Sequence, residues 1–383
     1  MKLSALAALP VMLRSRVDAP EVDLTAVHQD SRRASPTTAF YAMTGAKTDG
    51  HRYLESAQQA GAPALFVSDA AAFERLAAAP HAGRGGLFLV PPGREALADV
   101  SRAVFGDPSR HLKLLGVTGT NGKATVTFLA AQMLEALGQR CGIIGSLGMQ
   151  LGNAVDDPGR TTPEAPDVHG FLRQCVNQGV GVAAMEVSSI GLHQARTRGL
   201  RFAAAAFTNL TQDHLDYHGT MDTYAAEKAR LFLEYAPPWA VINLDDAFGR
   251  SLEQRVSGER ADATVLTYAV EGKSALTLSR VEQTAEGSRG PLHVEREAHP
   301  FTLPLPGAFN LENWLAAVGL LLAIGVPAAE IAQAASHCRG APGRFQRLPL
   351  PQPFAVVVDY AHTPDALETV LTTARRLTRG RVA

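Results

Sequence analysis

The chain of 383 residues is 46% hydrophobic and 19% charged, and its 36 basic residues nearly balance its 37 acidic ones. A chain of this length exceeds what one compact core accommodates, so we expect two or three domains. The even charge balance excludes a nucleic-acid-binding protein that relies on a broad basic surface.

The N-terminal segment MKLSALAALPVMLRSR carries a short apolar run but does not fit a secretory signal. Arg14 and Arg16 follow the run, and the segment has no small-residue cleavage site. The leucines instead have the spacing of one helix face, and they are Leu3, Leu6, Leu9 and Leu13.

Two further features favour a cytoplasmic protein without a membrane span. The longest apolar run, Trp314 to Val326, is shorter than the ~20 residues that cross a bilayer. The chain has three cysteines that lie far apart in the sequence, Cys141, Cys175 and Cys338. Their number and spacing fit neither a disulfide framework nor a zinc motif.

Residues 1–108 are predicted to form a small N-terminal α/β domain. We expect strands at Ala39–Met43 and Ala64–Val67, with a helix over Tyr53–Ala60 between them. The turn-rich segment from Gly106 to Arg110 marks the end of this domain.

Residues 109–340 alternate between strand-like and helical runs, which predicts a P-loop-like, mostly parallel sheet with helices on both faces. The predicted strands are Leu112–Val117, Val180–Val187, Ala203–Thr208 and Ala240–Asn243. The predicted helices include Phe128–Leu137, Met221–Tyr235 and Asn310–Ile324. Residues 262–304 are short alternating stretches, and we expect a small antiparallel insert there.

The segment GAPGRFQRL, residues 340–348, marks a second boundary, and a further strand is predicted at Phe354–Asp359. Residues 341–383 are too few for an independent core. We therefore expect them to be the beginning of a Rossmann-like C-terminal domain, and the chain to stop inside it.

The stretch GVTGTNGKATV, residues 116–126, runs from a predicted strand through a glycine turn into a helix. Such a turn presents backbone N–H groups to phosphate oxygens, and Lys123 would neutralise their charge. The full phosphate-loop pattern is not met, because Val117 and Ala124 replace its first glycine and its final Ser or Thr. That hydroxyl normally binds Mg²⁺, and Thr120 and Thr125 are the neighbours that could substitute. A purely structural glycine turn is the alternative.

Polar residues follow two further predicted strands, where ligands lie in open α/β sheets. The segment MEVSSIGLHQAR, residues 185–196, contains Glu186, Ser188, Gln194 and Arg196. The segment TNLTQDHLDYHG, residues 208–219, contains Asp213, His214, Asp216 and His218, and a helix carrying Lys228 follows. The alternatives are polar loops facing water and a solvated surface lysine. A zinc hydrolase using His214 and His218 is disfavoured, because no Glu lies between them in the required place and the glycine loop would be unexplained.

Together these segments resemble the Mur ligase family, and within it the MurE type, which adds the third amino acid to the peptidoglycan precursor. The other segments that carry the resemblance are DSRRASPTTAFYAMTGAKTDGHRYLESAQQAGAPALFV (30–67), TTPEAPDVHGFL (161–172), LPGAFNLENWLAA (305–317), GRF (343–345) and DYAHTPDAL (359–367). The resemblance implies an ADP-forming amide ligase of cell-wall synthesis, linked to cell shape and division. It acts on UDP-N-acetylmuramoyl-L-Ala-D-Glu through an acyl phosphate, with meso-diaminopimelate favoured over lysine as the amine.

The resemblance also implies roles for individual residues. The UDP-sugar peptide would be held by Ser31, Thr161, Thr162, Ser188, Gln194 and Arg196. The ATP triphosphate would be held by Gly119, Thr120, Asn121, Gly122 and Lys123, and its adenosine side by Asn310, Arg344, Asp359 and His362. Mg²⁺ would be bound by Glu186, His214 and Lys228, the last carbamylated by CO₂. The catalytic residues would be Lys123, Glu186, His214 and Lys228 in a monomer.

Three departures from the family pattern support a second hypothesis. Ala124 replaces the loop hydroxyl, Ile190 stands where these ligases commonly have histidine, and the sequence ends at LTRGRVA, before the family's motif for the incoming amino acid. The alternative is a non-catalytic or truncated ligase-derived protein that binds the UDP-sugar or ATP without turnover.

Overall fold

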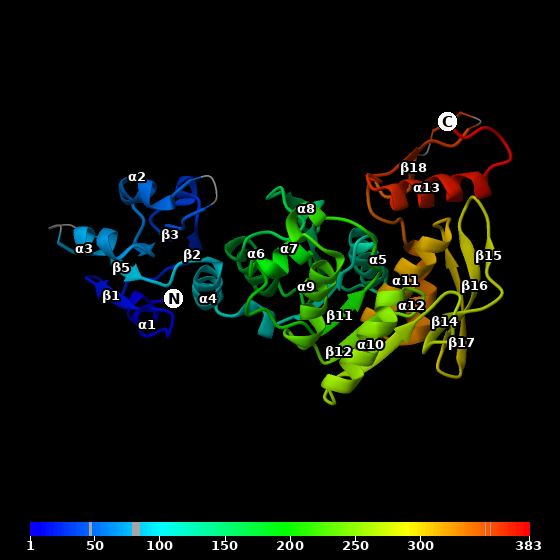
Figure 1. Ribbon diagram of the computed structural model, residues 1–383, viewed down its shortest axis with the longest axis horizontal. Coiled ribbons are helices and arrows are strands. Elements are labelled where there is room, and N and C mark those ends of the chain that lie inside the picture. Colours follow the sequence, from blue (N-terminus) through cyan, green and yellow to red (C-terminus); the bar gives the residue numbers. More distant parts are fainter. Residues whose placement is uncertain (46–47, 79–84, 349, 353) are drawn as a thin grey trace. The chain divides into compact units, whose positions relative to one another are not determined.

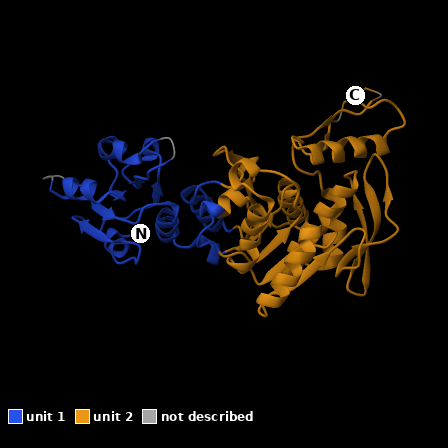
Figure 2. Ribbon diagram, viewed as in Figure 1, with its two compact units in different colours: residues 1–111, 163–179, 193–200 blue, residues 112–162, 180–192, 201–383 orange. Residues whose placement is uncertain are grey.

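The computed structural model describes residues 1–45, 48–78, 85–348, 350–352 and 354–383. The chain divides into two compact units (Figure 2), and each is built from separate stretches of sequence. Unit 1 comprises Met1–His111, Pro163–Gly179 and His193–Leu200, and unit 2 comprises Leu112–Thr162, Val180–Leu192 and Arg201–Ala383. Among the described residues no helix is long and apolar enough to cross a membrane.

Unit 1 contains a five-stranded sheet in the order β1-β5-β4-β3-β2, in which only the β1–β5 pair is antiparallel. The strands are β1 (Arg14–Val17), β2 (Ala26–His28), β3 (Thr38–Tyr41), β4 (Ala64–Val67) and β5 (Gly86–Leu89). The helices are α1 (Leu3–Ala7), α2 (Leu54–Gln59), α3 (Ala70–Ala78), α4 (Arg94–Val104) and α6 (Ala165–Asn177). The predicted α/β character of this region is confirmed.

The first helix is shorter than its leucine spacing predicts. Leu3 and Leu6 are fully buried in the core of unit 1, but α1 ends at Ala7 and Leu13 is 59% exposed. Pro10 follows three residues after the helix, and the chain then enters β1 as an extended strand. Proline fits poorly into a helix interior, which explains why the leucine pattern continues further than the helix does.

Unit 2 contains a twelve-stranded sheet whose centre is parallel, in the order β13-β12-β11-β6-β10-β7. These central strands are β6 (Lys113–Thr118), β7 (Cys141–Gly145), β10 (Val182–Glu186), β11 (Ala204–Phe207), β12 (Trp239–Asn243) and β13 (Thr264–Tyr268). Beyond β7 lie the antiparallel strands β8 (Gly148–Leu151) and β9 (Ala154–Asp156). Beyond β13 lies β14 (Leu276–Leu278), which pairs in parallel with β13 and antiparallel with β16 (Ser288–Val294). The other antiparallel partners of β16 are β15 (Glu282–Gln283) and β17 (Glu297–Leu303).

The expectation of a purely antiparallel insert over residues 262–304 is wrong at its start. β13 pairs in parallel with β12, from Trp239 opposite Thr264 to Asn243 opposite Tyr268. The connection between these strands is α10 (Ala247–Glu259), a helix that we did not predict. A helical crossover is what joins neighbouring parallel strands, so β13 extends the parallel sheet before the antiparallel strands begin.

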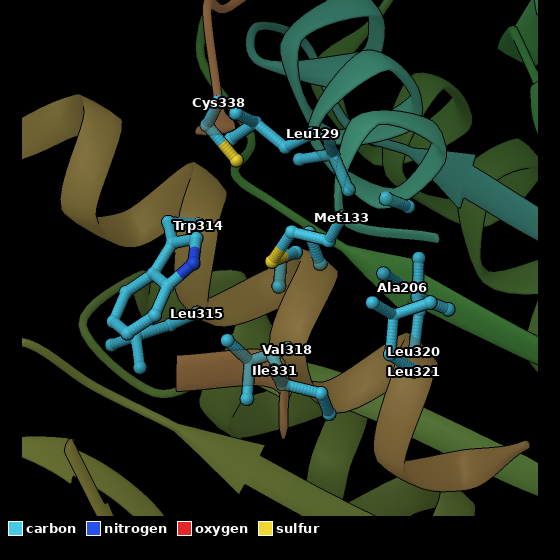
Figure 3. Close-up of a cluster of buried hydrophobic side chains, with 14 of the residues drawn as sticks. Leu129, Met133, Ala206, Trp314, Leu315, Val318, Leu320, Leu321, Ile331 and Cys338 are labelled. Carbon is cyan, nitrogen blue, oxygen red and sulfur yellow. The ribbon is translucent and has the colours of Figure 1, made fainter. Parts of the chain in front are cut away.

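Helices cover both faces of the central sheet (Figure 1), as predicted for this region. On one face α5 (Lys123–Ala136), α11 (Ala308–Ala323) and α12 (Ala328–Ala334) enclose the main core, in which Met133, Trp314 and Val318 lie (Figure 3). The opposite face meets α9 (Met221–Leu233), whose Leu231 lies next to Gly116 of β6. The remaining helices of unit 2 are α7 (Ser189–His193, whose last residue belongs to unit 1), α8 (Leu215–His218) and α13 (Pro364–Leu377).

The C-terminal residues form a two-stranded antiparallel ladder of β18 (Gln346–Arg347) and β19 (Val357–Val358), followed by α13. The predicted strand at Phe354–Asp359 is thus paired only over Val357–Val358. None of the residues of α13 is buried, although its sequence is amphipathic.

The buried histidine of α6 makes the stability of unit 1 depend on pH. His169 is 0% exposed, and burial lowers its pKa from 6.5 to about 4. The unfolded chain therefore binds a proton more readily between these values, and folding stability falls as the pH decreases through this window. Between pH 7.5 and 4.5 the loss should reach about 2–3 kcal/mol.

We expect the His169→Leu variant to lose this pH dependence, because leucine offers no site for the proton. Urea unfolding followed by circular dichroism at pH 7.5 and 4.5 measures the effect for both proteins. Equal losses of unfolding free energy in the wild type and the variant would contradict the prediction.

Candidate functional site

The glycine loop between β6 and α5 adopts a backbone that only glycine accommodates. Gly119 and Gly122 have φ values of 147° and 86°. A Cβ atom at Gly119 would lie 1.9 Å from the Thr208 hydroxyl oxygen, and one at Gly122 would lie 2.2 Å from the Asn313 amide oxygen. The first-turn N–H groups of α5 open onto this loop, which is the arrangement that binds phosphate.

Residues that follow β11 hold the loop in place. Asn209 accepts hydrogen bonds from the Thr120 N–H at its carbonyl (2.8 Å) and from the Asn121 N–H at its side-chain oxygen (2.9 Å). The Thr208 hydroxyl donates to the Asn121 carbonyl at 2.6 Å. Our sequence interpretation did not select Thr208 and Asn209, although their position after a strand next to β6 was a usable signal.

Lys123 closes back over the loop from the first turn of α5. Its Nζ donates to the carbonyls of Gly119 (2.9 Å) and Thr120 (2.8 Å). Burial lowers the pKa of Lys123, while Glu186 and Asp213 oppose that shift. The amine therefore lies within the electrostatic reach of two carboxylates beside the loop.

Glu186 is the last residue of β10 and is 2% exposed. Its Oε1 accepts two hydrogen bonds from Ser146, from the backbone N–H at 2.7 Å and the hydroxyl at 2.9 Å. Burial raises the pKa of Glu186, and Lys123 and Ser146 act against that shift. Ser146, which follows the neighbouring strand β7, is a second supporting residue that the sequence interpretation missed.

Lys228 lies in the interior rather than on the surface of α9, so the alternative of a solvated lysine is wrong. It is 1% exposed, its Nζ donates to the Gly119 carbonyl at 2.7 Å, and it lies 4.2 Å from the centre of the Tyr224 ring. Burial and the nearby Lys123 hold the pKa of Lys228 well below its ordinary value. The Tyr224 hydroxyl lies 3.2 Å from the Thr120 hydroxyl, which links this helix to the loop.

The two histidines of the segment after β11 occupy different surroundings. His214 caps α8 with φ 53°, its side chain is 41% exposed, and its Nε2 lies 3.6 Å from an Asp213 carboxylate oxygen. Burial lowers the pKa of His214, and Asp213 opposes this shift. His218 is 8% exposed, and its Nε2 lies 2.9 Å from the Ser189 hydroxyl. The histidines therefore do not form the i, i+4 zinc pair considered above.

The predicted substrate-binding residues fall into both compact units. In unit 2, Thr162 is 0% exposed, donates to the Glu186 carbonyl at 2.9 Å and accepts from the Ser188 N–H at 2.9 Å. Thr161 precedes this buried contact and is partly exposed. The Thr162 hydroxyl thus fixes the end of β10, and its partly exposed neighbours Thr161 and Ser188 offer the accessible groups.

The other predicted substrate-binding residues lie in unit 1. Ser31 begins a short 3₁₀ turn that the Asp30 side chain caps by accepting the Arg32 N–H. Arg196 is 9% exposed, donates to the Gln194 side chain at 2.5 Å and lies 3.5 Å from a Glu164 carboxylate oxygen.

The residues predicted to contact adenosine all belong to unit 2. Asn310 is 3% exposed and donates to the Pro306 carbonyl at 2.8 Å. Asp359 accepts from the N–H groups of Phe345 and Ala361, each at 2.6 Å. The Arg344 guanidinium lies 4.5 Å from the centre of the Tyr360 ring and contributes to the lowered pKa of Lys123.

His362, also predicted on the adenosine side, is exposed, and its Nδ1 lies 2.9 Å from the Tyr360 carbonyl. Ile190, which departs from the family pattern, lies in α7. Among the described residues no group of three or more His, Cys, Asp or Glu side chains is arranged to hold a metal ion. A metal at this loop would therefore need a ligand of another kind beside Glu186 and His214.

Three family models match stretches of this chain. Residues 23–104 match the Mur ligase family catalytic domain, residues 117–321 the Mur ligase middle domain, and residues 343–383 the Mur ligase glutamate ligase domain. The chain is 42% identical over 355 residues to a UDP-N-acetylmuramoyl-L-alanyl-D-glutamate–2,6-diaminopimelate ligase of Pseudomonas syringae, covering 92% of this chain and 71% of that protein.

The likeness extends to a more distant bacterium and to a solved structure. The protein with the same name from Bacillus licheniformis is 35% identical over 389 residues, covering 100% of this chain and 77% of that protein. A solved structure of a UDP-N-acetylmuramoyl-L-alanyl-D-glutamate–2,6-diaminopimelate ligase aligns with a TM-score of 0.78 at 28% identity, covering 98% of this chain and 74% of that one.

Proposed function

This chain belongs to the Mur ligase family, and we propose that it joins an amino acid to UDP-N-acetylmuramoyl-L-Ala-D-Glu with ATP as the energy source. The proposed amino acid is meso-diaminopimelate, because the relatives carry 2,6-diaminopimelate in their names. The observation that carries the proposal is the convergence of Lys123, Glu186 and Lys228 on one phosphate loop.

The chemistry requires activation of a carboxylate, which is a poor electrophile at neutral pH. The γ-carboxylate of the D-glutamyl residue attacks the γ-phosphorus of ATP, an O–P bond forms, and ADP leaves. The amine then attacks the acyl phosphate, a C–N bond forms, and phosphate leaves with the loss of one proton. Lys123 and the α5 N-terminus neutralise charge on the transferred group, and positioning supplies most of the remaining effect.

We further propose that Lys228 carries a carbamate. A neutral amine attacks CO₂, an N–C bond forms, one C=O π bond becomes a C–O⁻ group, and a proton leaves. The environment fits this modification, because Lys228 is buried, has a depressed pKa and donates to one backbone carbonyl. The carbamate oxygen would join Glu186 and His214 in holding Mg²⁺, which prefers oxygen ligands and supplies positive charge beside the phosphates.

The remaining assignments are proposals of the same kind. We divide the chain into an N-terminal UDP-substrate domain (1–108), a central ATP-binding domain (109–340) and the beginning of a C-terminal ligase domain (341–383). The three family matches fall within these ranges and support the division. We also propose that the protein acts as a monomer in the cytoplasm, with the UDP-sugar peptide and the amino acid as its partners.

The absence of a loop hydroxyl at Ala124 favours a second candidate, a ligase-derived protein that binds the nucleotide or the UDP-sugar without turnover. To separate the two, the chain is incubated with ATP, Mg²⁺, bicarbonate and UDP-N-acetylmuramoyl-L-Ala-D-Glu, with meso-diaminopimelate or lysine added separately. Mass spectrometry detects the amide product. Product with one amine supports the ligase, and folded chain that binds substrate without forming product supports the second candidate.

The position after Lys123 should also control the Mg²⁺ requirement. We expect Ala124→Ser to lower the Mg²⁺ concentration for half-maximal ADP formation about fivefold, because a ligand hydroxyl contributes about 1 kcal/mol. A Mg²⁺ titration of the steady-state rate measures this. Ala130→Ser is the control, because Ala130 is another buried alanine of α5. An unchanged Mg²⁺ requirement in Ala124→Ser would show that another group already fills this role.

A further inference from the structure

A buried hydroxyl group, that of Thr118, lies at the entrance to the phosphate loop. Thr118 is the last residue of β6, directly before the phosphate loop, and it is 0% exposed. Its carbonyl accepts from the Thr208 N–H at 3.0 Å, but its Oγ1 has no hydrogen-bond partner among the described residues. A buried hydroxyl without a hydrogen-bond partner lowers stability. An unpaired hydroxyl at this position therefore indicates that its acceptor belongs to a ligand or to a modified side chain.

The direction of this side chain follows from the register of β6. Side chains alternate between the two faces of a strand, so Thr118 shares its face with Gly116. A Cβ at Gly116 would lie against Phe202 and Leu231, which places this face against α9. The other face, with Leu115 and Val117, packs in the main core instead.

Lys228 extends from α9 into the space between this helix and the same face of β6. It is three residues before Leu231 and so lies on the same side of that helix, one turn nearer to the loop. Its Nζ donates at 2.7 Å to the carbonyl of Gly119, the residue that follows Thr118. The buried amine and the buried hydroxyl therefore lie between the same strand end and the same helix.

We propose that Thr118 is a positioning residue whose hydroxyl donates a hydrogen bond to the carbamate formed on Lys228. This inference rests on the proposed function, because it takes the carbamate as given. A carboxylate-like oxygen is the acceptor that an orphaned O–H group would bind, and a hydrogen bond to a charged group is stronger than a neutral one. Thr118 would thus increase the fraction of carbamylated Lys228 and fix the carbamate plane.

The test measures the carbamate directly by ¹³C NMR of the full chain in ¹³C-bicarbonate, with Lys228→Met identifying the signal. At limiting bicarbonate, Thr118→Val should reduce the signal at least tenfold, and Thr118→Ser should keep it. The valine variant should also melt about 2–4 °C higher, because it no longer buries an unpaired hydroxyl. Its ligase rate should recover as bicarbonate is raised.

Thr127→Val is the matched control, because Thr127 is also fully buried but its hydroxyl already donates to the Ala124 carbonyl at 2.9 Å. It should leave the carbamate signal unchanged. If the valine variant does not fold, Thr118→Ala removes the hydroxyl without adding volume. An unchanged carbamate signal in the hydroxyl-free variant overturns the inference. A wild type that forms the amide product but never shows a carbamate overturns it as well, while leaving the ligase assignment intact.

Discussion

Replacing Lys123 by methionine is expected to reduce kcat/KM for ATP about 10³-fold, because one preorganised positive charge beside a transferring phosphoryl group has an effect of that size. In the free chain the Lys123 Nζ donates to the carbonyls of Gly119 and Thr120, so it is already held within the loop. ADP formation at varied ATP concentration measures the loss. Methionine retains the length and much of the volume of lysine, which limits the effect on packing.

Two control variants distinguish the effect of losing the positive charge from an effect on folding. Lys113→Met changes the lysine that begins β6, the strand before the loop, where Nζ donates to the Ile324 carbonyl, and we expect less than a twofold effect. Lys123→Arg keeps the charge but replaces a compact ammonium group by a larger, planar guanidinium group, so we expect only partial activity. A Lys123→Met enzyme that retains wild-type kcat/KM would remove the lysine from the mechanism.

The elements that were predicted well from the sequence are those in which the local pattern of apolar residues matches the burial of the element in the folded chain. Ala64–Val67 forms β4 with the predicted bounds, and the predicted helix Asn310–Ile324 corresponds to α11. The glycine loop was also predictable, because a strand, two glycines and a lysine follow one another within a few residues. Local spacing was sufficient in these cases because the whole feature lies in one segment.

Features that join distant segments could not be predicted in this way. Asn209 lies 88 residues from Asn121, and only the parallel pairing of β6 with β11 brings them together. The assignment of α6 to unit 1 has the same origin, since its partner α4 lies far earlier in the chain. α10 was missed because its sequence has only a weak apolar stripe, and its role as a crossover is set by β12 and β13.

The burial of Lys228 is the most informative difference between sequence and structure. The segment YAAEKARLF is compatible with a surface helix, and the sequence left an exposed lysine open as an alternative. The structure instead places Lys228 against Gly119 and Tyr224 with 1% exposure. An amine at this depth has a depressed pKa, and its neutral form is the one that reacts with CO₂.

We therefore expect Lys228→Met to lose activity by about 10²–10³-fold, the effect of removing one charged group that acts on the transition state. The expected reason is chemical rather than steric, because methionine can fill the same buried position but cannot form the proposed carbamate. The rate of amide formation, measured by mass spectrometry at saturating ATP and Mg²⁺, gives the loss. Lys228→Arg should be equally impaired, since a guanidinium keeps a positive charge where the proposed carbamate would be an anionic ligand.

The dependence on CO₂ distinguishes a carbamate from a lysine that acts only as an amine. Wild-type enzyme stripped of CO₂ should lose most of its activity and regain it on addition of bicarbonate, whereas Lys228→Met should not respond at all. Because the free amine lies 2.7 Å from the Gly119 carbonyl, loss of CO₂ leaves a paired lysine in a folded site, and recovery needs no refolding. Full activity of CO₂-free enzyme, together with an inactive Lys228→Met, would assign the role to the amine itself and would contradict the proposal that Lys228 is a third protein ligand of Mg²⁺.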